Sequence, residues 1–459
     1  MGTVVQCISP IDGSVYLERE ALSPEAAMAA AKRARSAQAS WAARPLAERV
    51  ALVRAAVAEV GRTTDRMALE LAHQMGRPVR YGGEFGGFEE RASHMADIAQ
   101  EALAPIIVED SPAFLRKIER EPHGVVLVVA PWNYPYMTAI NTVAPALIAG
   151  NTVLLKHAAQ TLQVGERLAE AFHAAGVPAD VFQNLILDHD TTAGLISGRA
   201  VDFVNFTGSV GGGQAMERAA AGTFIPVSTE LGGKDPGYVR ADADLDAAVA
   251  TLIDGAMFNS GQCCCGIERI YVHDSLFNAF VEKAVALVSS YKLGNPLDPE
   301  TTIGPMAHVR FARTVRDQIE DAVAKGATTH IERFDADDGA AYLTPQILTN
   351  VTHDMEVMRE ESFGPVVGIM PVRDDAEAIA LMNDSRYGLT ASIWSADAGA
   401  AEAIGRQLQT GTVFLNRADY LDPGLCWTGC KDTGRGAGLS VLGFHALTRP
   451  KSYHLKKKL

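Results

Sequence analysis

The clearest pattern in the chain is a series of short apolar runs separated by helical sequence. Residues 125–129 (VVLVV) form a continuous run rich in β-branched residues, which is typical of a parallel strand covered on both faces. Similar runs recur at 152–155, 181–187 and 201–206, with helical sequence between them. Strands that alternate with helices predict βαβ units, so we expect an α/β fold with a doubly wound sheet.

The residues before this region predict helices and one exposed ribbon. Ser23 and Pro24 form a helix start, with Ser as N-cap and Pro at the first helical position. Residues 113–121 alternate partly and carry charges on one set of positions, as an exposed β-ribbon does. The helices that we expect cover residues 24–40, 45–61, 65–75 and 81–103.

A run of three cysteines is the main candidate for chemistry. A helix with apolar positions from Leu245 to Ala256 precedes it, Asn259 and Gly261 are suited to end that helix, and residues 268–273 alternate as a strand. Cys263, Cys264 and Cys265 therefore lie in a tight connection that can present a side chain to a cleft. Inert burial and a metal site are the alternatives from this stretch alone. Adjacent cysteines lack the usual spacing of zinc ligands, so we expect no metal.

Charge and composition exclude several classes of function. The 459 residues carry a net charge of -14, which disfavours a nucleic-acid binder. No apolar stretch is long enough to span a bilayer, and we expect no signal peptide and no membrane partner. Six cysteines, half of them contiguous, do not form a disulfide framework. We expect a reducing, cytoplasmic setting, which suits a free thiol.

A glycine-rich turn follows the strand predicted at 201–206. Residues 207–213 (TGSVGGG) precede a helix, and the free N–H groups at a helix N-terminus can bind an anion. The turn lacks the GxGxxG fingerprint. A phosphate site and a plain tight turn remain equally open from this stretch.

Four separated stretches together resemble the NAD(P)-dependent aldehyde dehydrogenase superfamily. The resemblance extends from Ser9 to the C-terminus. The sequence around Lys156 and Cys265 is similar to that of the shorter bacterial, succinate-semialdehyde dehydrogenase-like members of the superfamily. The four stretches are PWNYP at 131–135, TELGGK at 229–234, NSGQCC at 259–264 and EESFGP at 360–365.

The resemblance implies a covalent mechanism. Cys264 matches the nucleophile, which forms a thiohemiacetal with the aldehyde and then a thioester. Asn133 matches the donor that, with the Cys264 backbone N–H, stabilises the oxyanion. Glu230 matches the general base that activates water to release the acid. Transfer of the acyl group to coenzyme A and a catalytically inactive structural protein on the same scaffold are the alternatives.

The resemblance also implies a nicotinamide cofactor, NAD or NADP. The family often has Glu where this chain has Ala159, and that Glu disfavours a 2′-phosphate. With Ala159 there, and with positive charge expected from Lys156 and His157, we expect NADP to be accepted. Asp188 and Asp190 weaken this expectation, and Gly438 replaces a Glu thought to help proton relay. The implied cofactor residues are Trp132, Lys156, Gly208, Ser209, Glu361 and Phe363.

The aldehyde is expected in a funnel between two lobes. Apolar residues in the 417–427 loop favour an apolar or aromatic aldehyde, whereas Arg417 favours a semialdehyde carboxylate, and the sequence does not choose between them. The implied walls are Tyr136, Met137, Phe258, Cys263, Cys265, Arg417, Tyr420 and Trp427.

The resemblance finally implies a division of the chain. A Rossmann-like cofactor-binding domain covers 1–105 and 123–231, and a second α/β catalytic domain covers 232–430. A small β-ribbon oligomerisation element covers 106–122 and 431–459, which implies a homodimer or homotetramer.

Overall fold

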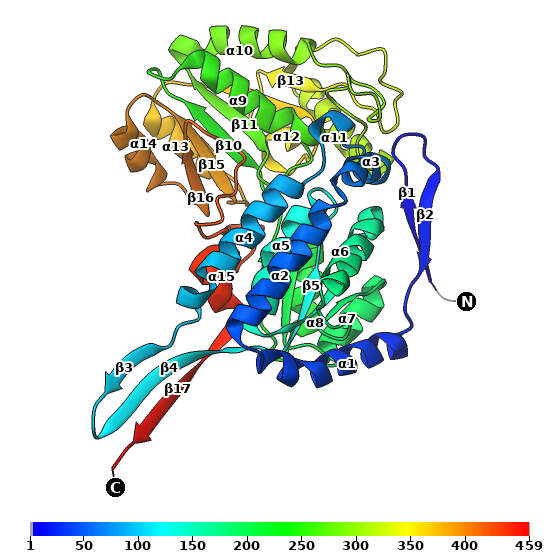
Figure 1. Cartoon of the computed structure of the whole chain (residues 1–459). Helices are drawn as coiled ribbons and strands as arrows, with labels where there is room; N and C mark the ends of the chain where they lie inside the picture. Colours follow the sequence, from blue (N-terminus) through cyan, green and yellow to red (C-terminus); the bar gives the residue numbers. More distant parts are fainter. Residues whose placement is uncertain (1–2, 459) are drawn as a thin grey trace.

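The computed structural model describes residues 3–458 and has three sheets and an N-terminal hairpin (Figure 1). The outermost residues of the predicted division, 1, 2 and 459, lie outside that range. The hairpin consists of the antiparallel strands β1 (Val4–Ile8) and β2 (Val15–Glu20), joined by the turn at 9–14. None of the helices within 3–458 has the length and apolar character needed to cross a bilayer.

The first large sheet has five parallel strands in the order β7-β6-β5-β8-β9. The predicted α/β class is thus confirmed. The strand expected at 181–187 is shorter than predicted, because Leu185 and Leu187 are buried in a loop rather than in the sheet. The strands are β5 (Val125–Val129), β6 (Thr152–Lys156), β7 (Phe182–Asn184), β8 (Phe203–Thr207) and β9 (Val227–Glu230).

Helices cover both faces of this sheet, which explains the continuous apolar run of β5. Val126 and Val128 belong to a core with α2, α4, α5 and α6, whereas Val125 and Leu127 belong to a core with α1, α7 and α8. Gly82, with a φ of 68°, delays the helix expected from residue 81, so α4 begins at Phe85 after a short 3-10 turn, η1 (Val79–Tyr81). The helices are α1 (Pro24–Ala42), α2 (Leu46–Gly61), α3 (Thr64–Met75), α4 (Phe85–Ala102), α5 (Pro135–Ala149), α6 (Leu162–Ala174), α7 (His189–Ser197) and α8 (Val210–Ala220).

The second large sheet has seven strands in the order β12-β13-β14-β11-β10-β15-β16, parallel except for β12. Its strands are β10 (Asp235–Val239), β11 (Ile267–His273), β12 (Thr328–Thr329), β13 (Gln346–Thr349), β14 (Val366–Val372), β15 (Thr390–Trp394) and β16 (Thr412–Leu415). Its helices are α9 (Leu245–Met257), α10 (Asp274–Ser289), α11 (Val309–Ala324), α12 (Glu356–Arg359), α13 (Asp375–Asn383) and α14 (Ala398–Gly405).

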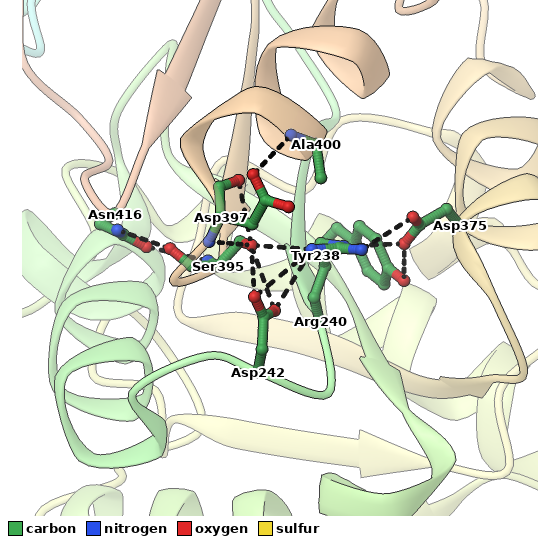
Figure 2. A network of polar contacts seen from close by, with 8 residues as sticks. All are labelled: Tyr238, Arg240, Asp242, Asp375, Ser395, Asp397, Ala400 and Asn416. Carbon is green, nitrogen blue, oxygen red and sulfur yellow. Dashed lines mark hydrogen bonds and ion pairs between the residues drawn. The ribbon is translucent and has the colours of Figure 1, made fainter.

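A polar network joins the carboxyl ends of three neighbouring strands of this sheet (Figure 2). Arg240 follows β10 and donates to Asp375 (Nε–Oδ1 3.0 Å) and to Ser395 (Nη1–Oγ 2.9 Å). Asn416, after β16, exchanges hydrogen bonds with the Ser395 backbone at 3.0 and 2.9 Å. The network therefore fixes the start of the 417–427 segment, which continues into the site described below.

The third sheet is an antiparallel ribbon that projects from the body of the protein (Figure 1). It consists of β3 (Ile106–Asp110), β4 (Phe114–Pro122) and β17 (Thr448–Lys456). The helix α15 (Ser440–Ala446) precedes β17 and packs on α4 and α5. Ile106, Ile107 and Val108 are exposed on the ribbon. The predicted domain boundaries and the role of the ribbon in assembly stay predictions.

Candidate active site

A tight turn presents the three cysteines between α9 and β11. Asn259, Ser260 and Gly261 all have left-handed backbones, with φ of 55°, 57° and 70°. A Cβ atom on Gly261 would lie 2.2 Å from the Gly364 carbonyl oxygen, so only glycine fits there. This packing joins the cysteine turn to the EESFGP loop and leaves Cys264 half-buried.

A buried arginine connects the cysteine turn to the PWNYP loop. The Arg77 guanidinium donates to Glu84 Oε1 at 2.7 Å, to Asn259 Oδ1 at 3.3 Å and to the Asn133 carbonyl at 2.5 Å. Glu84 Oε2 in turn accepts from the backbone N–H groups of Tyr136 and Met137 at 2.9 Å, in the first turn of α5. One ion pair therefore positions two motifs that are more than 100 residues apart in the sequence.

The thiols of Cys263 and Cys265 converge on one carboxyl group. Their Sγ atoms lie 3.6 Å apart and donate to Asp419 Oδ1 at 3.1 and 2.9 Å, and all three sulfurs lie within 4.8 Å of one another. The two flanking thiols, whose sulfurs lie within 4.8 Å, lower the pKa of Cys264 below that of a free thiol, while burial raises the pKa of Asp419. Cys264 is the thiol of the three that this arrangement favours as a thiolate.

Glu230 lies at the end of β9 and shares a cavity of about 250 Å³ with Cys264. Burial raises the pKa of Glu230 to about 7, against a smaller opposing effect of the nearby Arg91 cation. A carboxyl group with a pKa near neutrality is suited to act as a general base. The segment that ends at Gly438 packs beside it, because the Thr229 and Leu231 N–H groups donate to the carbonyls of Arg435 and Thr433.

Asn133 lies against the cysteine turn. Its Nδ2 is 3.3 Å from the Gln262 carbonyl oxygen and the side chain is buried. Unlike Cys264 and Glu230, it is not among the described residues that line the 250 Å³ cavity. The structure thus brings the amide beside the loop that carries Cys264, and its catalytic role stays a prediction.

The cavity walls differ from the expected set at two positions. Tyr136 is 1% exposed and packs edge-on against Phe88 at 6.3 Å, because the first turn of α5 directs it into the core; Tyr134 lines the cavity instead. The Arg417 guanidinium lies 3.6 Å above the Tyr420 ring, and Arg417 is not among the described lining residues. The residues placed as expected are Met137, Phe258, Cys263, Cys265, Tyr420 and Trp427.

Arg91, Asn141 and Asp419 are among the polar lining residues that the sequence did not indicate. Arg91 and Asn141 lie on α4 and α5, and Asp419 lies in the segment after β16. Arg91 falls between Phe88 and Met95 on the buried face of its helix, so a charge at an apolar position was the available signal. Asp419 lies in an irregular segment with a left-handed backbone (φ 51°), so no periodicity in the sequence indicated which way its side chain faces.

A second cavity, of about 450 Å³, contains part of the expected cofactor set. Trp132, Lys156 and Ala159 line it, together with Asp188 and Arg310. Burial lowers the pKa of Lys156, and Asp188 partly offsets this. Arg310 is an exposed cation that the sequence reasoning did not single out.

The positive charge expected from His157 is wrong. Burial lowers the pKa of His157 to about 3, so the imidazole is neutral at pH 7. Its ring nitrogens lie 3.2 Å from Thr161 Oγ1 and 3.3 Å from the Pro135 carbonyl. The side chain therefore holds the loop after β6 rather than attracting an anion.

The remaining expected cofactor residues lie in two loops. Glu361 accepts from the Gly233 N–H at 3.1 Å, and burial raises its pKa to about 8. The Phe363 ring meets Trp132 edge-on at 5.5 Å, which connects the EESFGP loop to the second cavity. Glu268 anchors this loop by accepting from the Ser362 and Phe363 N–H groups at 2.8 and 2.9 Å.

The glycine-rich turn has a local structural role. Ser209 caps α8 by accepting from the Gly212 N–H at 3.2 Å, and the Gly208 N–H donates to the Glu230 carbonyl at 3.1 Å. Neither residue is among the described residues that line the 450 Å³ cavity. Their expected contact with a pyrophosphate stays a prediction.

Comparisons with known proteins agree with this architecture. The model of the aldehyde dehydrogenase family matches residues 2–453. The chain is 34% identical over 421 residues to a succinate-semialdehyde dehydrogenase [NADP(+)] of Deinococcus radiodurans, covering 92% of this chain and 88% of the relative. It is 36% identical to a 4,4′-diapolycopene aldehyde oxidase of Methylomonas sp, covering 95% and 82%.

Solved structures are similar over nearly the whole chain. One is an NADP-dependent glyceraldehyde-3-phosphate dehydrogenase from Bacillus halodurans complexed with NADP, at 33% identity and a TM-score of 0.94, covering 100% of this chain and 96% of that one. Another is a succinate-semialdehyde dehydrogenase from Burkholderia pseudomallei, at 29% identity and a TM-score of 0.94. The chain belongs to the aldehyde dehydrogenase family.

Proposed function

We propose that the protein oxidises an aldehyde to the carboxylic acid through a thioester on Cys264, with Glu230 as the base that activates water. The observation that supports this most is the shared cavity in which the pKa of Cys264 is lowered and that of Glu230 is raised to about 7. Groups whose environments shift their pKa values in these directions supply a nucleophile and a base at the same pH.

The first step uses the thiolate. Cys264 Sγ forms a bond to the aldehyde carbon, and the carbonyl π electrons move to the oxygen. The Asn133 amide and the Cys264 backbone N–H are the donors we assign to that oxyanion, since the amide already lies within 3.3 Å of the Gln262 carbonyl in the same loop. When the oxyanion collapses to the thioester, the hydrogen on the same carbon leaves as hydride, for which a bound nicotinamide dinucleotide would be the acceptor.

The second step uses Glu230. The carboxylate takes a proton from a water molecule whose oxygen attacks the thioester carbon. The C–S bond then breaks, the Cys264 thiolate leaves and the acid is released. The proton passes from Glu230 to solvent, which restores the base. Gly438 has no side chain to assist this transfer, so Glu230 and water perform it alone.

The second cavity fits a dinucleotide. Lys156 and Arg310 supply cations for phosphates, and Trp132 and Phe311, whose rings are stacked at 5.1 Å, supply flat apolar surface. Ala159 has no carboxylate to repel a 2′-phosphate, whereas Asp188 adds one negative group. We therefore propose that NADP is accepted, and the names of the Deinococcus relative and of the Bacillus structure support this. A kcat/KM for NAD more than tenfold above that for NADP would contradict it.

The decisive experiment traps the thioester. Glu230→Gln removes the base, so incubation with an aldehyde and both cofactors should give one reduced cofactor per subunit and an acylated Cys264 peptide by mass spectrometry. Normal steady-state turnover by this variant would exclude Glu230 as the base. Reduced-cofactor release that requires coenzyme A would favour the acyl-transfer alternative, and unreactive Cys264 in an iodoacetamide assay would favour the inactive scaffold.

We also propose that subunits assemble through the ribbon of β3, β4 and β17. Ile106, Ile107 and Val108 expose apolar surface on β3, as a contact between subunits requires. Equilibrium sedimentation distinguishes a monomer from the homodimer or homotetramer that we expect.

A further inference from the structure

Arg91 is a buried cation in the wall of the substrate cavity. It lies in the middle of α4 and is 8% exposed. Its neighbours on the buried face of the helix, Phe88 and Met95, belong to the hydrophobic core. Burying a charged group in an apolar core is costly unless the group is paired and hydrogen-bonded. The hydrogen bonds that Arg91 lacks therefore indicate which ligand the cavity is suited to bind.

The protein itself satisfies only part of the guanidinium. One nitrogen, Nη1, donates to the Met137 carbonyl at 3.1 Å and, at the limit of hydrogen bonding, to Asn141 Oδ1 at 3.4 Å. The Nε atom is buried and has no hydrogen-bond partner among the described residues. A guanidinium has five donors in a planar fork that matches a carboxylate. A carboxylate in the cavity would pair with Nη2, which makes no hydrogen bond among the described residues, because Nε is too deeply buried for a ligand to reach.

The carboxyl groups of the described cavity wall do not form hydrogen bonds with the Arg91 guanidinium. Glu230 attracts Arg91 enough to affect its own pKa, yet no hydrogen bond joins the two side chains. Glu90 accepts from the Tyr420 hydroxyl at 2.7 Å, and Asp419 accepts from two thiols. Among the described lining residues, Arg91 is the one lysine or arginine. The remaining wall is largely apolar, including Met137 and Trp427.

We propose that the preferred substrates are short aldehydes that carry a carboxylate at the far end of the chain, and that Arg91 binds this carboxylate. The proposal rests on the proposed function, because it names the substrate class of the same site. A cavity of about 250 Å³ has room for about eight water molecules at ~30 Å³ each, which suits a short oxo acid.

Arg417, the arginine that the sequence offered for a carboxylate, is a matched control. It is exposed and stacks on Tyr420, outside the described cavity wall. The two arginines thus lie near the same cavity but differ in burial and in orientation.

The test compares two aldehydes of similar shape, 4-oxobutanoate and its neutral methyl ester, in the wild type and in Arg91→Met, Arg91→Lys and Arg417→Met. The measured quantity is the ratio of the two kcat/KM values. We expect the wild type to prefer the acid at least tenfold and Arg91→Met to lose about 10–100-fold of that ratio, the usual effect of removing a charged hydrogen bond. Arg91→Lys should retain part of the preference, and Arg417→Met all of it.

The ratio separates recognition from the other effects of Arg91. Loss of its attraction to Glu230, or a small distortion of α4, changes both substrates alike and cancels. A wild-type ratio near one, or an unchanged ratio in Arg91→Met, would overturn the proposal, as would loss of the preference in Arg417→Met alone. If Arg91→Met fails to fold, Arg91→Lys and the wild-type ratio still decide. Oxidation of the ester by the wild type tests the proposed function separately, so the two can fail independently.

Discussion

Gly438 leaves room for the carboxylate of Glu230. A Cβ atom at residue 438 would lie 2.8 Å from Glu230 Oε1, closer than a carbon and an oxygen can approach without movement. Gly438 also exchanges backbone hydrogen bonds with Trp427, at 2.9 and 2.8 Å, so its main chain is held in place. The carboxylate, rather than the glycine, has to move when a side chain is added.

Gly438→Ala is therefore expected to displace the carboxylate of Glu230, the base that we propose. We expect kcat to fall about tenfold, since a small misplacement of a reacting group has effects of this order or larger. The acyl-enzyme should accumulate, because release of the acid is the step that slows. Pre-steady-state measurement of reduced cofactor checks this through a burst. Gly194→Ala, where an added Cβ meets no atom within 4 Å, is the control, and equal kinetics in both variants would contradict the prediction.

The pH dependence of acid release should follow Glu230. Its carboxyl must be deprotonated to accept a proton, and burial raises its pKa to about 7. The deacylation rate should increase about tenfold between pH 6 and pH 8 and level off above that. Acylation should change less, because the pKa of Cys264 is lowered. Single-turnover kinetics measure both steps, and a deacylation rate that falls over this range would reverse the assignment.

Arg91 offers a second measurement on the same base. Its positive charge lowers the pKa of Glu230, in opposition to burial. In Arg91→Met the midpoint of the deacylation profile should therefore move to higher pH, and this should occur with the neutral ester as well as with the acid. A midpoint that moves to lower pH would mean that the two side chains do not interact as described.

Asn133→Ala is expected to lower kcat by about 100–1000-fold, the usual effect of one oxyanion donor. Steady-state kinetics on a correctly folded variant, verified by its melting temperature, measure the effect. A fall of less than threefold would remove Asn133 from the mechanism and leave it as a structural contact to Gln262.

The Arg77–Glu84 pair should contribute strongly to stability. Their side chains are 4% and 1% exposed, so Arg77→Met leaves a buried carboxylate without its cation. We expect the free energy of unfolding to fall by about 3–5 kcal/mol, measured by denaturant titration. Arg373→Met, which breaks an exposed pair with Glu377, should change little. If the Arg77 variant is no less stable than this control, the pair is not what joins the two motifs.

Periodicity predicted the elements whose environment is uniform. The run at 125–129 indicated a strand covered on both faces, and the structure divides its side chains between two cores. The boundaries that moved depend on contacts distant in sequence. Leu185 and Leu187 are apolar enough for a strand, but they are buried in a loop after β7.

Part of the candidate site could also be predicted from the sequence. The motifs singled out Cys264 and Glu230, which line one cavity, and Asn133, which lies beside the cysteine turn; their catalytic roles stay predictions. Arg91 and Asp419 were missed, since their importance comes from which side chains face them across the fold. The charge of His157 was wrong because burial, which no local pattern reports, determines its pKa.

The last thirty residues contribute to two different parts of the structure. The stretch from Thr433 to Gly438 runs beside β9 and its Glu230, and the same chain then continues through α15 into β17 of the ribbon. Deleting the tail to obtain a monomer would thus also remove the residues that pack beside Glu230, the base that we propose. Polar replacement of Ile106, Ile107 and Val108 on β3 would instead test the proposed assembly through the ribbon while leaving these contacts in place.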